Sequence, residues 1–196
     1  GMFFIGYFVF EVPSNMILEK IGARRWVPLI MVAWGGATLS LAFVTTPLEF
    51  YVIRFFIGFA EAGFFPGIVL FMTYWFPASH RGRMMALFMT GIAVSGLIGG
   101  PLCGAIIEYL DGYAGFAGWQ WLMITTGLPT FIVAAAIYVL LTDRPNQANW
   151  LSNREQHVLA VSLGNPERTK TSMKAGLMNF WTWSSAWIYF LLVCGG

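Results

Sequence analysis

The sequence is short of charge. Asp, Glu, Lys and Arg make up only 10% of its 196 residues, whereas hydrophobic residues make up 58% and the mean hydropathy is +0.68. A soluble domain carries roughly 25% charged residues, so this chain has too few polar side chains to cover a water-soluble globule. Several apolar stretches reach about 20 residues, the length at which a helix crosses the hydrocarbon of a bilayer. We therefore predict an all-α polytopic membrane protein.

Cysteine is also scarce, and catalytic motifs are missing. The two cysteines, Cys103 and Cys194, lie in apolar stretches. They indicate neither a disulfide framework nor a metal site, and we interpret both as small buried hydrophobic side chains. The chain contains no H-E-x-x-H and no G-x-S-x-G, and nothing supplies a nucleophile with a base beside it. We expect no catalytic residue, no metal and no organic cofactor.

Six apolar stretches predict membrane spans, and a long polar connection divides them. Residues 1–142 contain five spans, residues 143–179 form the polar connection, and residues 180–196 begin another span. The chain starts inside one span and stops inside another, so we interpret it as a piece of a longer protein. The spans are predicted at about 1–18, 26–45, 50–76, 84–109, 119–142 and from about 180 onward.

Basic residues occur in alternate connections. The first, third and fifth connections hold ten of the eleven Lys and Arg residues, and the second and fourth hold none. By the positive-inside rule the basic connections face the cytoplasm, so we place 19–25, 77–83 and 143–179 on that side. This topology accounts for the basic loops without a nucleic-acid partner. The ten cations are Lys20, Arg24, Arg25, Arg81, Arg83, Arg144, Arg154, Arg168, Lys170 and Lys174.

The polar connection contains the pattern of a helix start. Ser152 followed by Glu155 matches a capping box, in which each side chain binds the backbone N–H of the other residue. We expect a short amphipathic helix there, within a cytoplasmic linker. His157 on this helix is expected to be solvated or interfacial, and His80 in the third connection is expected at the surface.

The eleventh cation, Arg54, lies inside an apolar span, in the stretch RFFIGFAEAGFFPG that also holds Glu61. Charge at membrane depth is expensive and normally faces the bundle interior or a water-filled cavity. A spacing of seven places the two side chains on one face, roughly 10 Å apart along the helix axis, with Gly58 leaving an open notch between them. Arg54 could grip a carboxylate bidentately, and Glu61 could bind and release a proton. Alternatively, each pairs with a neighbouring helix and only fixes packing.

A second pair of polar residues lies in the first span. Tyr7 precedes Glu11 by four residues, so the two share a helix face. Tyr7 is a candidate ligand contact, although a packed aromatic ring is the alternative. Glu11 is expected to hold helices together rather than to bind substrate.

Small residues recur in the stretch SGLIGGPLCG. Three glycines lie four residues apart on one face, beside a proline, and such spacing lets helix backbones approach closely. We predict tight helix packing at this face, which could also slide or kink. The packing positions are Gly58 in the earlier stretch, and Gly96, Gly100, Pro101 and Gly104 here.

Three stretches resemble motifs of the major facilitator superfamily. PSNMILEKIGARRW (13–26) is similar to the loop between the second and third spans of that superfamily, with Asn15 where Gly is usual and Glu19 where Asp is usual. RFFIG (54–58) resembles its fourth-span motif, with Ile where Gln often stands, and GLIGGPLCG (96–104) resembles its fifth-span glycine-proline motif. Their order along the chain implies a partial helical bundle of that superfamily.

A closer resemblance, over essentially the whole chain, is to the anion:cation symporter family and its bacterial permeases for tartrate, phthalate, hydroxyphenylacetate and sugar acids. The stretches GYFVFEVPSN, RFFIGFAEAGFFPG, TYWFPASHRGRMMALFM, GGPLCG, GWQWL and DRPNQANWL carry this likeness. It implies twelve spans in two six-helix bundles. This chain would hold spans two to six, the cytoplasmic linker and the start of span seven.

The resemblance also implies roles for individual residues. Arg54 and Tyr7 would contact the anionic substrate, and Glu61 would couple its movement to a proton. Residues of the first cytoplasmic loop would form a latch that differs between inward- and outward-facing states, although its charged members could also serve only to set topology. The latch residues would be Glu19, Gly22, Arg24 and Arg25.

These roles predict proton-coupled uptake of an organic anion, such as a carboxylate or sugar acid, across a bacterial inner membrane by a monomeric protein. The proton would be the coupling ion. Two alternatives stay open. One is an antiporter or exporter of the same superfamily, because the glycine-proline motif is often associated with antiporters. The other is a membrane sensor that binds a ligand without moving it.

Overall fold

Residues 1–163 form one compact unit of the chain. The predicted span from about 180, and the C-terminal part of the 143–179 connection, fall largely outside the described residues. The computed structural model describes residues 1–163, 179, 180, 184 and 187.

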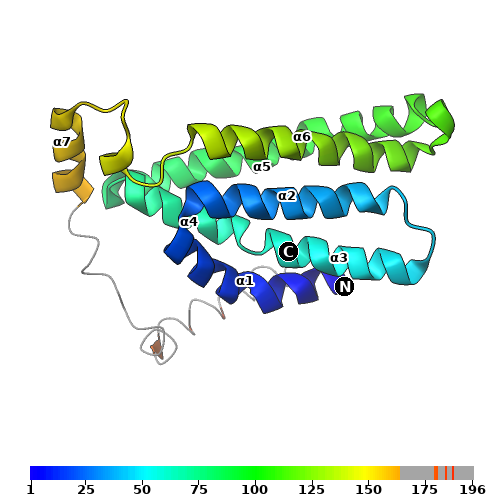
Figure 1. Ribbon diagram of the computed structural model, residues 1–196, viewed down its shortest axis with the longest axis horizontal. Helices are drawn as coiled ribbons and strands as arrows, with labels where there is room; N and C mark the ends of the chain where they lie inside the picture. Colours follow the sequence, from blue (N-terminus) through cyan, green and yellow to red (C-terminus); the bar gives the residue numbers. More distant parts are fainter. Residues whose placement is uncertain (164–178, 181–183, 185–186, 188–196) are drawn as a thin grey trace. The chain divides into compact units, whose positions relative to one another are not determined.

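The first unit is a bundle of helices, and the described residues contain no strand. The helices are α1 (Met2–Ile21), α2 (Ala23–Leu41), α3 (Pro47–Glu61), α4 (Phe64–Trp75), α5 (Ala78–Tyr109), α6 (Gly118–Leu140) and α7 (Asn153–Leu163), with short 3-10 turns η1 (Tyr113–Gly115) and η2 (Pro145–Gln147). Helix α1 packs along α3, α2 packs on α3 and α6, and α5 packs on α6 (Figure 1). The predicted all-α fold is confirmed.

Four segments of the described chain are long and apolar enough to cross a membrane: α1, the stretch from α3 through α4, α5 and α6. They correspond to four of the five spans predicted in residues 1–142. The fifth corresponds to α2, which does not reach the same hydropathy because Arg24 and Arg25 lie in its first turn. Helix α2 ends at Leu41, four residues before the predicted boundary.

The span predicted as one helix over 50–76 is two helices. Helix α3 ends at Glu61, and α4 follows after Ala62 and Gly63. Pro66 explains the break, because it has no N–H to donate to the Ala62 carbonyl four residues earlier and its ring clashes with a helical carbonyl at that position. The break follows Glu61 directly, near the middle of a span of 29 residues.

Helix α3 starts with a capping box. The Thr46 hydroxyl accepts a hydrogen bond from the Glu49 N–H (3.3 Å), and the Glu49 carboxylate accepts one from the Thr46 N–H (3.2 Å). Pro47 occupies the first turn, where a missing N–H leaves no helical bond unmade. These residues begin the helix three positions before the predicted boundary at 50.

The three basic connections meet at one end of the bundle. The backbone N–H of Arg24, at the start of α2, donates to Asp143 just beyond α6 (2.8 Å). The indole N–H of Trp75, at the end of α4, donates to the carbonyl of Thr142 (3.1 Å). The first, third and fifth connections therefore share an end, as their charge pattern predicted.

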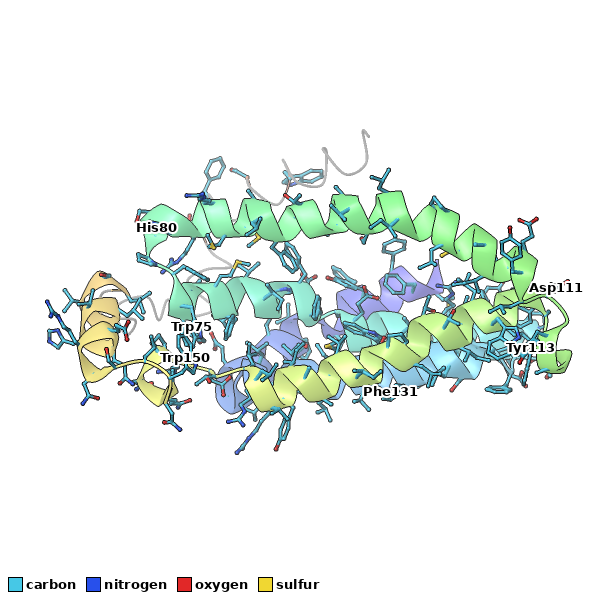
Figure 2. All side chains as sticks on the ribbon, turned by 90° about the horizontal axis from the view of Figure 1, so that it is seen from above. Trp75, His80, Asp111, Tyr113, Phe131 and Trp150 are labelled. Atoms are coloured by element: carbon cyan, nitrogen blue, oxygen red, sulfur yellow. The ribbon has the colours of Figure 1, made fainter. Side chains whose placement is uncertain are left out.

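The second and fourth connections meet at the opposite end. There the side-chain amide of Gln120 donates to the carbonyl of Ala42 (2.6 Å), which ties the start of α6 to the end of α2. Figure 2 shows the same division, with Trp75, His80 and Trp150 at one end and Asp111 and Tyr113 at the other.

Two of the basic connections are shorter than predicted. Only Gly22 separates α1 from α2, so Arg24 and Arg25 are helical residues rather than loop residues. In the 77–83 connection, Arg81 already belongs to α5, and its guanidinium donates to the Phe76 carbonyl at the end of α4 (2.9 Å). Arg24, Arg25 and Arg81 therefore lie at helix ends.

The core lies among α1, α2 and α6. Its buried members include Leu18, Trp26, Val27 and Ile30. Ser14 is the one buried polar side chain among the described residues, and its hydroxyl accepts a hydrogen bond from the Trp26 indole (2.9 Å). A buried hydroxyl needs such a partner, because leaving it unpaired away from water costs free energy.

Candidate functional site

Arg54 and Glu61 both lie on α3, seven residues apart, and both side chains are half-buried. The guanidinium carbon of Arg54 lies 5.3 Å from the centre of the Phe50 ring, a cation–π geometry. Within the described part of the chain, neither Arg54 nor Glu61 makes a hydrogen bond or an ion pair. The described helices therefore do not supply the charge partners that a purely structural role would require.

Gly58 lies between these two residues, and the open notch predicted there is wrong. Gly58 is buried, and a Cβ built on it would collide with the backbone carbonyl of Phe3 in α1. Gly6 of α1 faces the carbonyl of Phe55 in the same way. Two glycines therefore bring the backbones of α1 and α3 into direct contact, as small residues do in membrane bundles.

This crossing carries Tyr7 next to α3. Tyr7 follows Gly6, which touches the α3 backbone, and its half-buried ring lies against Phe3 with ring centres 6.1 Å apart. The structure thus brings α1, which bears Tyr7, against the helix that bears Arg54 and Glu61. Glu11, one turn further along α1, is half-buried and makes no hydrogen bond or ion pair within the described residues, so its expected role between helices stays a prediction.

The break after Glu61 is packed against two other helices. Gly63 lies against the hydroxyl of Ser14 in α1, so closely that a Cβ on Gly63 would collide with it. The same hydroxyl is bound by Trp26 of α2. Glu61 is therefore two residues from a buried polar junction of α1, α2 and α4, a feature that the sequence analysis missed. Pro66 was the signal that could have revealed it.

The glycine face of α5 has no neighbour in the described part of the chain. Helix α5 has no buried residue. A Cβ built at any of its glycines in this stretch would meet nothing within 4 Å, and the proline beside them is exposed. The expected tight packing is therefore not made by the described helices. The positions concerned are Gly96, Gly100, Pro101 and Gly104.

Two of the four predicted latch residues contact the end of α6. The backbone N–H of Arg24 donates to Asp143 Oδ1 (2.8 Å), and its Nε donates to the carbonyl of Tyr138 (2.9 Å). Gly22 has φ 85°, a region that favours glycine, and a Cβ there would collide with the Asp143 carboxylate. Asp143 thus sits at the N-terminus of α2, where a negative charge is stabilised by the helix dipole.

The other two latch residues differ from each other. Arg25 lines a polar pocket of 450 Å³ beside Asp143 and Gln147. Glu19 is exposed and makes no hydrogen bond or ion pair in the described residues. The sequence analysis did not identify Asp143 as a partner of this region. Two features of the sequence could have identified it: an acidic residue directly after an apolar span, and another span that starts with two arginines.

The short helix expected in the polar connection is α7. Its capping box forms as the sequence suggested: Glu155 accepts from the Ser152 N–H (2.8 Å) and hydroxyl (2.7 Å), and the Glu155 N–H donates to the Ser152 hydroxyl (3.3 Å). The side-chain hydrogen bond from Ser152, followed by the backbone one, lowers the pKa of Glu155 from its ordinary 4.5. His157 on this helix and His80 at the start of α5 are both exposed.

No cluster of three or more His, Cys, Asp or Glu side chains that could hold a metal occurs within residues 1–163 or at the four described positions beyond them. Cys103 is a half-buried free thiol. The site built by α1 and α3 therefore offers a guanidinium, a carboxyl and a phenol, which are groups that bind through hydrogen bonds and charge.

Comparison with known proteins relates this arrangement to membrane transporters. The family described as Major Facilitator Superfamily matches residues 1–196. A protein of Agrobacterium vitis with a provisional assignment as a tartrate transporter is 42% identical over 194 residues, which cover 97% of this chain and 45% of that protein. The inner membrane transport protein RhmT of Escherichia coli K12 is 34% identical over 191 residues, covering 96% of this chain and 44% of RhmT.

A third relative carries a different name. A quinolone resistance transporter of Acinetobacter baumannii is 42% identical over 167 residues, which cover 85% of this chain and 38% of that protein. The chain thus spans less than half the length of each of these relatives.

Proposed function

Because the chain belongs to the major facilitator superfamily, we propose that it is part of a secondary transporter that takes up an organic anion together with a proton. The observation that carries this proposal is the pair Arg54 and Glu61 on α3. Both are ionisable residues inside a membrane span, and neither has a hydrogen-bond or ion-pair partner among the described residues. Such residues mark substrate and ion pathways in membrane proteins.

Arg54 is the proposed anion contact. A guanidinium presents donors in a planar fork that matches a carboxylate, so a carboxylic or sugar acid fits it better than a neutral solute. Tyr7 is the second proposed contact, because the crossing of α1 and α3 carries it towards the same helix. The name of the Agrobacterium relative, which refers to tartrate, supports an acid of this kind.

Glu61 is the proposed proton carrier. When Glu61 is protonated and Arg54 holds an anion, both charges are neutralised, so the loaded site costs less to enclose in a medium of low dielectric. This difference would shift the population towards the occluded state. On the cytoplasmic side, where the pH is higher, Glu61 would lose its proton and the anion would leave.

The described helices provide only part of such a site. Transporters of this kind bind substrate near the middle of the membrane between repeated bundles, and this chain spans 45% of the Agrobacterium relative. We propose that the remaining helices complete the site in a monomer. The basic end of the bundle, with 19–25, 77–83 and 143–179, would face the cytoplasm of a bacterial inner membrane.

Export is the second candidate function. The quinolone resistance transporter, 42% identical over 167 residues, and the glycine-proline stretch of α5 favour it. An exporter driven by proton entry would move substrate against the direction of proton flow. The direction of substrate flux under an imposed pH gradient therefore separates the two candidates, and binding without flux would indicate a sensor.

Uptake by the full-length protein in proteoliposomes tests the proposal. With acid outside, a panel of labelled tartrate, sugar acids and aromatic acids should include one that accumulates. Arg54→Ala should reduce its uptake at least about tenfold, because a hydrogen-bonded charge pair is lost. Arg83→Ala is the matched control, since it removes an exposed cation at the basic end. Equal uptake by Arg54→Ala and Arg83→Ala would refute the anion site.

A further inference from the structure

Residues 142–150, here called the strap, lie against the end of α4. The Trp75 indole N–H donates to the Thr142 carbonyl (3.1 Å). The Trp150 ring stacks on the Trp75 ring, with centres 5.6 Å apart and planes 4° apart, and Figure 2 shows these two side chains together. The guanidinium carbon of Arg144 lies 5.2 Å from the centre of the Tyr74 ring. Three strap residues therefore hold the last two residues of α4.

The strap also contacts the start of α2. Its Asp143 carboxylate accepts the Arg24 N–H (2.8 Å) and fills the space that the missing side chain of Gly22 leaves. The strap follows α6 after Leu141, and α6 packs along α2. Its contacts therefore fasten the C-terminal end of α4 to the N-terminal end of α2.

Helix α4 also packs on the core through Leu70 and Phe71, and Arg81 of α5 donates to carbonyls at its end, but two features leave it room to move. At its N-terminal end it is separated from α3 by Ala62 and Gly63. Beside it lies an apolar cavity of 230 Å³, to which α4 contributes Ile68, Phe71 and Met72. Residues of α2, α5 and α6, together with Phe76 and Leu141 just beyond the ends of α4 and α6, form the rest of the lining. A helix with a break at one end and a cavity at its side has room to pivot if its other end is released.

We propose that the strap is a clasp that locks the end of α4 to α2, and that opening this clasp lets α4 pivot at Ala62 and Gly63. One stacked pair, one cation–π contact and one neutral hydrogen bond are each weak, so the clasp can open without unfolding the core. Trp150 is 68% exposed despite its stacking, and it can therefore leave without disturbing buried side chains. The break directly follows Glu61, so a pivot of α4 would carry a change of state at the proposed site to the linker. This role of the clasp rests on the proposed function.

The clasp is tested by the reactivity of a thiol placed in the cavity, in the full-length protein. Met72→Cys, with all other cysteines replaced, is labelled with N-ethylmaleimide. A thiol reacts as the thiolate, which an apolar cavity disfavours, so labelling should be slow while the clasp is closed. Trp150→Ala should accelerate labelling about tenfold, the size expected when an aromatic pair is lost. Trp150→Phe keeps a ring and should restore slow labelling.

Trp119→Ala is the matched control, because Trp119 is an exposed tryptophan (46%) at the start of α6, at the opposite end of the bundle. Labelling of Trp150→Ala within about twofold of the parent, or equal acceleration by Trp119→Ala, would overturn the clasp. Labelling needs no transport, so the two proposals fail separately. If the parent protein takes up an acid but Trp150→Ala does not change the labelling rate, only the clasp is refuted. If Trp150→Ala accelerates labelling but the parent takes up no acid, only the proposed function is refuted.

Discussion

The stretch from α3 through α4 and the helix α5 are built from similar residues but behave differently. Both combine apolar side chains with glycines and a proline. In the first, glycines contact the backbone or side chains of other helices and the chain breaks before Pro66. In the second, a single helix of 32 residues runs through Pro101, and within the described part of the chain none of its residues is buried. The same composition therefore yields a broken span in one place and, in the other, a continuous helix that the described helices leave largely uncovered.

The neighbours of each proline account for part of this difference. Glycine does not distinguish the two spans, because Gly63 lies three residues before Pro66 and Gly99 and Gly100 directly precede Pro101. At the break, however, Ser14 fills the space beside Gly63, whereas nothing in the described structure lies within 4 Å of a Cβ at Gly99 or Gly100. A proline breaks a helix more readily where a neighbouring side chain packs against the break.

The largest effect is expected from a side chain at Gly58. Gly58→Leu should destabilise the protein by about 3 kcal/mol, at the upper end of the usual cost of overpacking, because the Phe3 backbone occupies the space. The measurement is the thermal unfolding temperature in detergent. Gly100→Leu is the control, since nothing lies within 4 Å of its Cβ position. If Gly100→Leu is equally harmful in the full-length protein, a helix beyond the described residues covers α5.

A smaller effect, on coupling, is expected at Glu61. Glu61→Gln cannot release a proton, so accumulation driven by a pH gradient should fall about tenfold, within the usual range of coupling energies. Exchange of internal for external substrate should persist, because Arg54 is intact. Glu108→Gln, near the end of α5 and exposed, should leave both activities unchanged. Full accumulation by Glu61→Gln would show that another group carries the proton.

The free energy of unfolding should fall by about 1 kcal/mol when the junction beside the break loses one hydrogen bond. Trp26→Phe keeps most of the buried ring but removes the N–H that donates to Ser14 (2.9 Å), and a typical hydrogen bond contributes about that much to stability. Amide hydrogen exchange at residues 62–67 should become faster. Trp119→Phe, which changes an exposed ring at the far end, is the comparison. If amide exchange at residues 62–67 is unchanged in Trp26→Phe, this hydrogen bond does not stabilise the break.

The smallest effect is expected in α7, which lies outside the spans. The folded-state pKa of Glu155 lies below its ordinary 4.5, so the stabilisation from its capping box is present above pH 4.5 and is lost as the pH falls through that lower value. Amide exchange in α7 should therefore accelerate on acidification. Ser152→Ala removes the pairing and should flatten this pH dependence, whereas Ser162→Ala at the other end of α7 should not.

The sequence allowed the fold class, the five apolar spans of residues 1–142 and the alternation of basic connections to be predicted, because hydropathy and charge are summed over many residues. It did not allow the partners of single residues to be predicted. Gly58 was recognised as a packing position, yet its notch was expected to be open, because the α1 backbone that fills it lies some fifty residues away in the chain. Asp143 was missed for the same reason: its contact with Arg24 spans 119 residues.

Prediction of the candidate site was likewise partial. The positions of Arg54 and Glu61 on one helix follow from their spacing alone, and the structure bears this out. The break beside Glu61 depends on Pro66, whose effect on a helix depends on tertiary context and was therefore not anticipated.

The single residue between α1 and α2 has a mechanical consequence. Because only Gly22 lies outside both helices, the angle between them is set by the two backbone torsions of one residue, φ 85° and ψ 157°. A longer linker would absorb a rotation of α1 over several bonds. The single residue Gly22 instead transmits a rotation of α1 to α2. Through α2, the rotation reaches α6, which packs alongside it.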